Sequence, residues 1–249
     1  MSHFTVLVVG DNWEKQLAPY NKGLEVEPYV DQPAKEVKRE YRKIMKKAKT
    51  SDEDYMQEYK HRPDMPIEKW AEDWYGQSLD AEGNLLTTYN PDSKWDWYLM
   101  GGRWTGFFLL KDGAGGEIGV PGAMTKACLD VKRADQARKG DIDWEGMVKE
   151  SLEEYERKWK EALACEDSAE KYFRYDVKEA ETREDYIRRQ AFPSTFAVVK
   201  DGKWYEKGKM GWWAIVTDEK DPSDWEDEFR ALIADLPDDT LLTLVDCHI

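Results

Sequence analysis

The chain has 249 residues and a net charge of −15, and 41% of its residues are apolar while 36% are charged. Its 12 Trp, 13 Tyr and 7 Phe residues exclude a disordered chain, because disordered segments are poor in aromatic side chains. Its apolar runs fall short of the roughly 18 residues that a membrane span needs. Three scattered cysteines argue against a disulfide framework or a structural zinc site, so we predict a cytoplasmic protein without a membrane partner.

The charge is unevenly distributed along the sequence. The segment 34–49 carries eight basic residues and two glutamates, a net charge of +6 within an acidic chain. It is either a solvated helix face or a docking surface for a phosphate-bearing or acidic partner. The overall charge of −15 argues against direct binding of a nucleic-acid duplex, because it repels the phosphate backbone.

The first part of the chain begins with a buried strand. Residues 4–9 form a continuous apolar run with β-branched side chains, which is typical of a strand covered on both faces. After Pro33, apolar residues recur at helical spacing and predict an amphipathic helix over 34–49. Residues 51–90 are polar and interrupted by prolines, so we expect long, partly irregular connections there with a short helix over Ile67–Tyr75.

The middle of the chain combines glycine-rich strands with long helices. The aromatic segment Trp95–Leu110 contains three glycines, which predicts two strands joined by a turn or bulge. A glycine-rich loop is expected over Gly113–Gly122, which is either flexible or wraps closely around another part of the molecule. Apolar residues at steps of three and four then predict a helix over Trp144–Leu163, and a second helical stretch over Ser168–Arg189.

The end of the chain contains the clearest hairpin signal. Thr195–Val199 and Lys203–Glu206 flank the dipeptide Asp201-Gly202, which favours a two-residue hairpin turn. A further strand is expected over Gly211–Val216.

The fold class follows from the two ends of the chain. A helix that begins at Pro222 leads into a last buried strand over Leu241–Val245. Neither the first nor the last apolar strand can be left in solvent, so we place both in one sheet. The predicted fold is α+β, with a mixed or antiparallel sheet that joins the N- and C-terminal strands, and a ferredoxin-like outline fits it. We interpret residues 1–249 as a single main domain with a helical insertion over 141–191.

Several motifs along the whole chain carry a resemblance. They are MSHFTVLV at Met1–Val8, YNPDSKWDWY at Tyr89–Tyr98 with GGRW at Gly101–Trp104, and VDCHI at Val245–Ile249. With these motifs the chain resembles a family of bacteriophage and bacterial proteins that has no assigned reaction. The resemblance implies a phage setting, with a role in nucleic-acid metabolism or in countering host defence, and a location in the host cytoplasm.

The segment Lys94–Tyr98 is the first candidate for a chemical role. If it is a strand, alternation places Lys94, Asp96 and Tyr98 on one face and Trp95 and Trp97 on the other. The Trp face is the natural core face. The opposite face would then present an ammonium, a carboxylate and a phenol to a ligand.

The bend that follows this segment is the second part of the same candidate site. Gly101 and Gly102 allow close approach of a ligand, and their N–H groups can form an anion-binding nest. Arg103 supplies a fork suited to phosphate, and Trp104 can stack on a base. Alternatively, the glycines form a bulge, Arg103 pairs with Asp96, and Trp104 belongs to the core.

A second cluster contains the histidines near the two ends of the sequence. If the first and last strands are antiparallel neighbours, His3 lies near His248, and with Asp246 the two imidazoles can bind a metal or act as acid and base. Alternatively, both histidines are exposed or bonded to the backbone. Cys247 is a weak candidate nucleophile, since neighbours on a strand face opposite sides.

Two further groups of residues are weaker candidates. Asp135, Asp141 and Asp143 can hold Mg²⁺ or a sugar hydroxyl, although helix capping also explains the last two. Lys209 precedes a glycine and two Trp residues, of which Trp213 is expected to line a pocket.

These features predict a protein that binds a nucleotide-like or other anionic small molecule in a Trp/Arg-lined pocket. Catalytic processing of the bound molecule is a further hypothesis. The expected ligand-binding residues are Lys94, Gly101, Gly102, Arg103, Trp104, Lys209 and Trp213. The candidate catalytic residues are Asp96, Tyr98 and His248, and the candidate metal ligands are His3, Asp246 and His248. No particular cofactor is indicated.

Two alternatives belong to other functional classes. One is an acidic interaction protein that occupies the nucleic-acid site of a host protein, which the net charge of −15 favours. The other is a metal-dependent hydrolase that uses the histidine cluster. Motifs of P-loop NTPases, dinucleotide-binding enzymes, zinc proteases, α/β-hydrolases and zinc deaminases are absent from the sequence.

Overall fold

The computed structural model describes residues 2–50, 53–62, 64–123, 132–211 and 215–249. The chain divides into two compact units, one formed by Met1–Asn21 with Asp92–Ile249 (unit 1) and one formed by Lys22–Pro91 (unit 2). The sequence pattern pointed to one main domain with its insertion at 141–191 and did not indicate this division.

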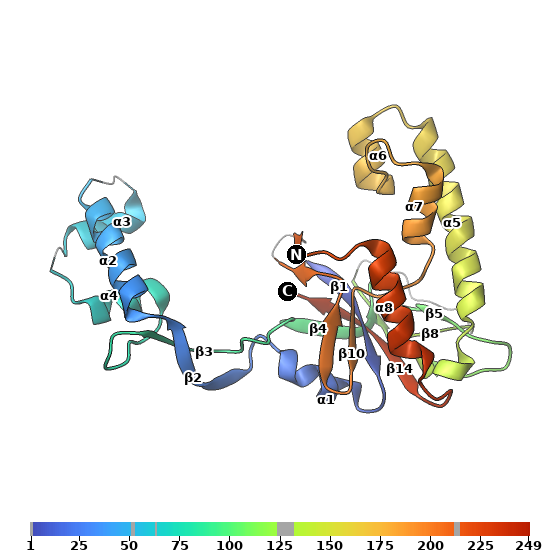
Figure 1. The fold of residues 1–249 in the computed structure, drawn as a ribbon, viewed down its shortest axis with the longest axis horizontal. Coiled ribbons are helices and arrows are strands. Elements are labelled where there is room, and N and C mark those ends of the chain that lie inside the picture. Colours follow the sequence, from blue (N-terminus) through green and yellow to red (C-terminus); the bar gives the residue numbers. More distant parts are fainter. Residues whose placement is uncertain (1, 51–52, 63, 124–131, 212–214) are drawn as a thin grey trace. The chain divides into compact units, whose positions relative to one another are not determined.

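Unit 1 is built on a mixed sheet that joins the two ends of the chain (Figure 1). The strand order is β11 (Lys203–Glu206), β10 (Ala197–Lys200), β1 (His3–Val9), β14 (Leu241–His248), β4 (Trp97–Gly102) and β7 (Val120–Pro121). β1 pairs with β14 in antiparallel register from His3 opposite His248 to Val9 opposite Leu242, and with β10 in parallel register. The predicted α+β fold with joined terminal strands is confirmed.

The central strands are covered on both faces, which explains their continuous apolar runs. Leu7 and Leu244 face one core, where α8 (Pro222–Ala234) and α5 (Trp144–Ala164) contribute buried side chains. Val6 and Val245 face a second core, to which α1 (Trp13–Leu17) and the 3₁₀ turn Ala18–Tyr20 contribute. Successive side chains along each strand therefore point alternately into the two cores.

Short elements complete unit 1. They are β5 (Phe108–Leu109), β6 (Gly116–Glu117), β8 (Arg133–Ala134), β9 (Gln136–Arg138), the 3₁₀ turn Lys139–Asp141, α6 (Ser168–Tyr175), α7 (Arg183–Gln190), β12 (Lys209–Met210) and β13 (Val216–Thr217). The helix expected over Ser168–Arg189 is two helices, because Asp176 ends α6 with a left-handed φ of 56° and Thr182 caps α7. The strand expected over Gly211–Val216 falls largely on residues outside the described ranges.

Unit 2 has a core of its own. Its elements are β2 (Glu25–Gln32), α2 (Ala34–Ala48), α3 (Asp54–Lys60), α4 (Ile67–Tyr75) and β3 (Leu85–Tyr89). Val37, Trp70 and Leu85 are fully buried in that core. The helices α2 and α4 match the prediction, whereas 51–90 also contains α3 and β3 where we expected irregular chain. β2 lacks a period-2 pattern because both of its faces are largely exposed.

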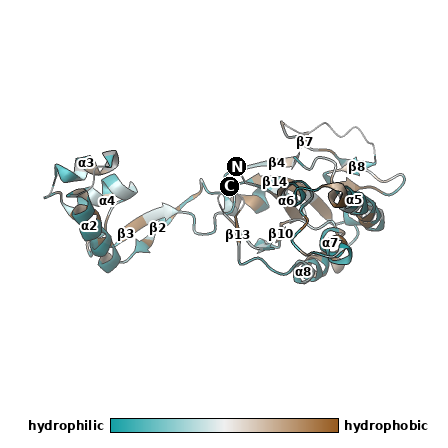
Figure 2. Ribbon diagram, turned by 90° about the horizontal axis from the view of Figure 1, so that it is seen from above, coloured by the Kyte–Doolittle hydropathy of each residue, from teal (hydrophilic) through white to brown (hydrophobic). Residues whose placement is uncertain are grey.

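Hydropathy differs between the elements, as Figure 2 shows, with brown along the central strand β14 and teal along α2. None of the described helices is long and apolar enough to cross a membrane.

Candidate functional site

Two aspartate–histidine pairs meet where β1, β14 and β4 lie side by side. The register of β1 and β14 places His3 opposite His248, and their rings contact edge to face with centroids 5.0 Å apart. Nδ1 of His3 lies 2.8 Å from Oδ1 of Asp246, and Nδ1 of His248 lies 2.6 Å from Oδ1 of Asp96. The predicted proximity of the two histidines is confirmed, and each has a carboxylate of its own.

The carboxylates determine what the two imidazoles can do. An ionised carboxylate only accepts hydrogen bonds, so each Nδ1 must carry the proton and donate it. Each Nε2 then has a free lone pair, which is the form of a base or a metal ligand. Nε2 of His248 is buried and has no hydrogen-bond partner among the described residues. His3 keeps 12% of its side chain exposed and His248 keeps 19%, so both rings are partly accessible.

The Gly101-Gly102 bend does not form an open anion nest. The backbone N–H of Arg103 donates to Oδ2 of Asp246 at 3.0 Å, and Asp246 is 1% exposed. A Cβ on Gly102, whose φ is +54°, would overlap the Asp246 side chain. The glycines are therefore required by an internal carboxylate, and the bend supports the His3–Asp246 pair instead of receiving a ligand.

A second buried carboxylate fixes the loop that follows. Asp135 is fully buried, and it accepts hydrogen bonds from the N–H groups of Gly106, Phe107 and Gly119 at 2.7, 3.1 and 2.8 Å. Burial raises the pKa of Asp135, while these three N–H groups oppose the rise. A Cβ on Gly101 would lie 2.5 Å from its Oδ2. The predicted role of Asp135 in holding Mg²⁺ or a sugar is wrong, because the backbone occupies both of its oxygens.

The expected alternation around Asp96 is also wrong. Trp97 is 46% exposed, and its ring lies 5.9 Å from His3, whereas Tyr98 packs against the buried Trp95 at 4.8 Å. The chain bends at Asp96, and regular strand begins only at Trp97. Tyr98 therefore faces the core, while Asp96 joins the histidines.

The predicted cations do not converge on one pocket. Lys94 forms an ion pair with Glu206 at 2.8 Å, and Lys209 forms one with Asp218 at 2.7 Å. The side chain of Arg103 is exposed. Trp213 lies outside the described residues.

Trp104 lines a recess on the same face of the sheet as the histidine pairs. The recess has a volume of about 380 Å³, and its other walls include Thr5, Phe107, Tyr155 and Arg189. Thr5 stands two residues from His3 on β1 and opposite Asp246 on β14, so it connects the recess to the cluster. Of the predicted ligand-binding residues that the structure describes, only Trp104 lines this recess.

The recess wall carries cations that sequence reasoning missed. Arg189 is paired with Asp176 at 2.6 Å and Glu181 at 2.9 Å, and Lys207 is paired with Glu219 at 2.9 Å. No motif indicated these residues, because they come from segments far from Trp104 in the sequence and meet only through the fold.

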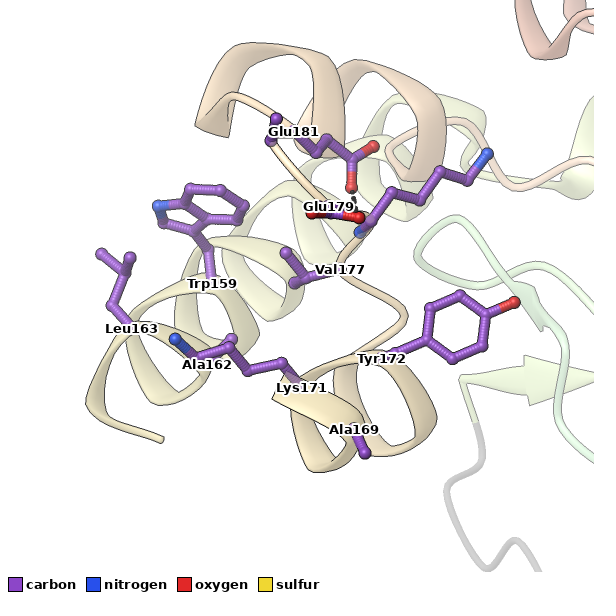
Figure 3. Close-up of a pocket in the computed structure, with 11 residues that line it drawn as sticks. Trp159, Ala162, Leu163, Ala169, Lys171, Tyr172, Val177, Glu179 and Glu181 are labelled. Atoms are coloured by element: carbon purple, nitrogen blue, oxygen red, sulfur yellow. Dashed lines mark hydrogen bonds between the residues drawn. The ribbon is translucent and has the colours of Figure 1, made fainter. Parts of the chain in front are cut away.

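A larger cavity of about 690 Å³ lies among α5, α6 and the segment 177–181 (Figure 3). The close-up shows Trp159 and Leu163 on α5 and Lys171 and Tyr172 on α6 around it. None of the residues that the sequence predicted for a site lines this cavity.

The weaker candidates have structural roles. Asp143 caps α5 by accepting a hydrogen bond from the N–H of Gly146 at 2.9 Å, as the capping alternative predicted. Cys247 is fully buried on the core face opposite the histidines, and burial raises the pKa of its thiol well above the usual value. Within the described ranges, no group of three or more His, Cys, Asp or Glu residues is arranged to hold a metal ion.

Comparison with protein-family models, with curated proteins and with solved structures gave no match. The resemblance to the phage family stays a prediction.

Proposed function

We propose that unit 1 binds a nucleotide-like anionic small molecule in the recess beside Trp104 and processes it by proton transfer at the histidine pairs. The observation that carries this proposal is the contact of two imidazoles, each held by a carboxylate on Nδ1, next to that recess.

The pairs supply the parts of acid–base chemistry. A carboxylate on Nδ1 fixes the tautomer and orientation of an imidazole and stabilises its protonated form. His3 acts as the base that meets the ligand. The pair of His248 and Asp96 is the second proton-transfer group, and it exchanges protons through the carboxylate of Asp96, which is 37% exposed, because Nε2 of His248 is buried. Such catalysis contributes typically about 10²- to 10⁴-fold to a rate. Cleavage of a phosphoester needs one group that removes a proton and one that supplies a proton, which suits this arrangement.

The surroundings favour a ligand with a flat ring and polar groups. Trp97 is exposed beside His3, and Trp104 and Phe107 line the recess. Aromatic faces of this kind can stack on a base. Arg189 and Lys207 also line the wall, where each is held in ion pairs with carboxylates, and Ser151 and Ser194 contribute hydroxyl groups.

The test begins with binding. Thermal unfolding of the full chain is followed with a panel of nucleoside mono-, di- and triphosphates and cyclic and linear dinucleotides. We expect a rise of Tm with at least one of them and its loss in Trp104→Ala. If no nucleotide in the panel shifts the Tm, the proposal is overturned.

Turnover of the nucleotide that binds is then followed by ³¹P NMR. We expect His3→Gln to lower kcat/KM by about 10²-fold or more, because the base is lost. His61→Gln is the matched control, since His61 belongs to unit 2. Equal rates in the two variants would contradict a catalytic role of His3.

A role in countering host defence, a cytoplasmic location and the alternative of an acidic inhibitor stay predictions from the sequence. The alternative of a metal-dependent hydrolase gains no support, because Asp246 already binds both His3 and the backbone of Arg103.

A further inference from the structure

One face of α2 in unit 2 is a continuous row of cations. Its members are Lys35, Lys38, Arg39, Arg42, Lys46 and Lys49, at positions i, i+3, i+4, i+7, i+11 and i+14. Residues at this spacing share one side of a helix. All six are exposed, and we call this row the cationic stripe.

The cationic stripe is not neutralised by the unit that carries it. The other two basic residues of the segment, Lys43 and Lys47, form ion pairs with Glu40 and Glu53. None of the six stripe residues forms an ion pair with another residue in the described part of the chain. Glu36 and Glu40 lie off the stripe, so the row contains six positive charges and no carboxylate.

The opposite face of α2 is not available to a binding partner, because it is buried. Val37, Ile44, Met45 and Ala48 are buried in the core of unit 2. The helix therefore has no apolar face to insert into a membrane, and the stripe has no aromatic residue to stack on bases. The binding mode that remains for the cationic stripe is electrostatic contact with a row of negative charges.

We propose that the cationic stripe binds the phosphate backbone of nucleic acid without reading its sequence. A helix of this length extends about 20 Å, which corresponds to about six base-pair steps of a duplex. Lysine and arginine contacts to phosphate position a protein but carry no sequence information.

The net charge of −15 argued against duplex binding. However, exposed charges more than about 10 Å apart are largely screened at 0.1 M salt, so the local charge at the contact decides the outcome. This proposal does not depend on the histidine site of unit 1.

The test is fluorescence anisotropy with the full chain and labelled 20-bp DNA and RNA duplexes of two unrelated sequences, between 50 and 200 mM KCl. We expect binding at 50 mM KCl that is equal for the two sequences and that weakens steeply with salt. Binding of either type of duplex supports the proposal. No binding at 50 mM KCl, or binding only to vesicles of anionic lipid, overturns it.

A charge-matched pair of variants assigns the binding to α2. The triple variant Lys38→Gln, Arg42→Gln and Lys46→Gln should lower the slope of log K against log salt by about 2.7, because each lost phosphate contact removes about 0.9. The control Lys149→Gln, Lys160→Gln and Lys203→Gln changes the net charge equally at three exposed lysines of unit 1. An equal change of slope in both variants would show that only net charge matters and would refute the assignment.

Discussion

At the scale of single residues, buried carboxylates organise the centre of unit 1. Asp246 connects His3 to the backbone of Arg103, and Asp135 binds three backbone N–H groups of two loops. Both require a glycine whose backbone they can approach. Close packing against these two carboxylates therefore explains why both positions are glycine. The groups that a ligand can reach are the neighbouring His3 and Trp104.

Asp135→Asn tests this organisation. The amide NH₂ would face a backbone N–H in place of an accepting oxygen, which leaves a buried donor without an acceptor. We expect a loss of about 1–3 kcal/mol in the free energy of unfolding. Urea unfolding of Asp135→Asn measures it. Asp112→Asn, at a side chain that is 91% exposed, is the control and should keep the wild-type midpoint. Equal midpoints for all three proteins would contradict the role given to Asp135.

At the scale of elements, α7 packs against α5 around a buried tyrosine. Tyr186 is fully buried, its ring lies 5.3 Å from that of Trp159, and its hydroxyl donates to the carbonyl of Tyr175 at 2.8 Å. Burial raises the pKa of Tyr186 from 10.0 to about 12. The docking of the helices is therefore linked to the protonation of this phenol.

The sign of the pH dependence follows from that shift. Between pH 10 and 12 the unfolded chain releases the phenolic proton while the folded chain retains it, so this contribution is present below pH 10 and is lost as the pH rises toward 12. It amounts to at most about 2.7 kcal/mol. We expect the free energy of unfolding to fall less between pH 9 and 11 in Tyr186→Phe than in the wild type. Tyr172→Phe, at an exposed ring, should behave like the wild type, and identical slopes for all three would contradict the expectation.

The sequence predicted those elements whose apolar period has a single explanation. Residues 4–9 and Leu241–Val245 were placed in one sheet because both are strongly apolar, and their observed antiparallel register brings His3 to His248. The faces of Asp96 and Tyr98 were wrong because a bend before Trp97 breaks the alternation, and nothing in the residue types marks it. The recess around Trp104 was not predictable in detail, because its walls come from segments that only the packing of α5 and α7 brings together.

At the scale of the whole molecule, unit 2 is inserted between two neighbouring points of unit 1. The carbonyl of Tyr20 accepts a hydrogen bond from the N–H of Lys94 at 2.8 Å, and Asn21 forms a bridge with Trp95. Unit 2 buries Trp70 and Leu85 in a separate core. Among the described residues, the side chains of each hydrophobic core therefore come from a single unit.

Excision of unit 2 tests this independence. A chain in which a short Gly/Ser linker replaces Lys22–Pro91 should fold, because Tyr20 and Lys94 already hold the cut ends together. We expect a cooperative thermal transition by circular dichroism and unchanged nucleotide binding in the recess, with loss of duplex binding. An unfolded product would show that unit 1 needs unit 2.

The strand order also affects how the protein is made. Among the strands of this sheet, β14 comes last in the sequence, yet it lies between β1 and β4 in the finished sheet. During translation, β1 and β10 can already pair, but β4 has no neighbour that joins it to them. A growing chain therefore exposes an apolar strand edge on β1 until Leu241–His248 has emerged from the ribosome and pairs with it. Chaperone binding to stalled nascent chains should fall sharply once that stretch has emerged.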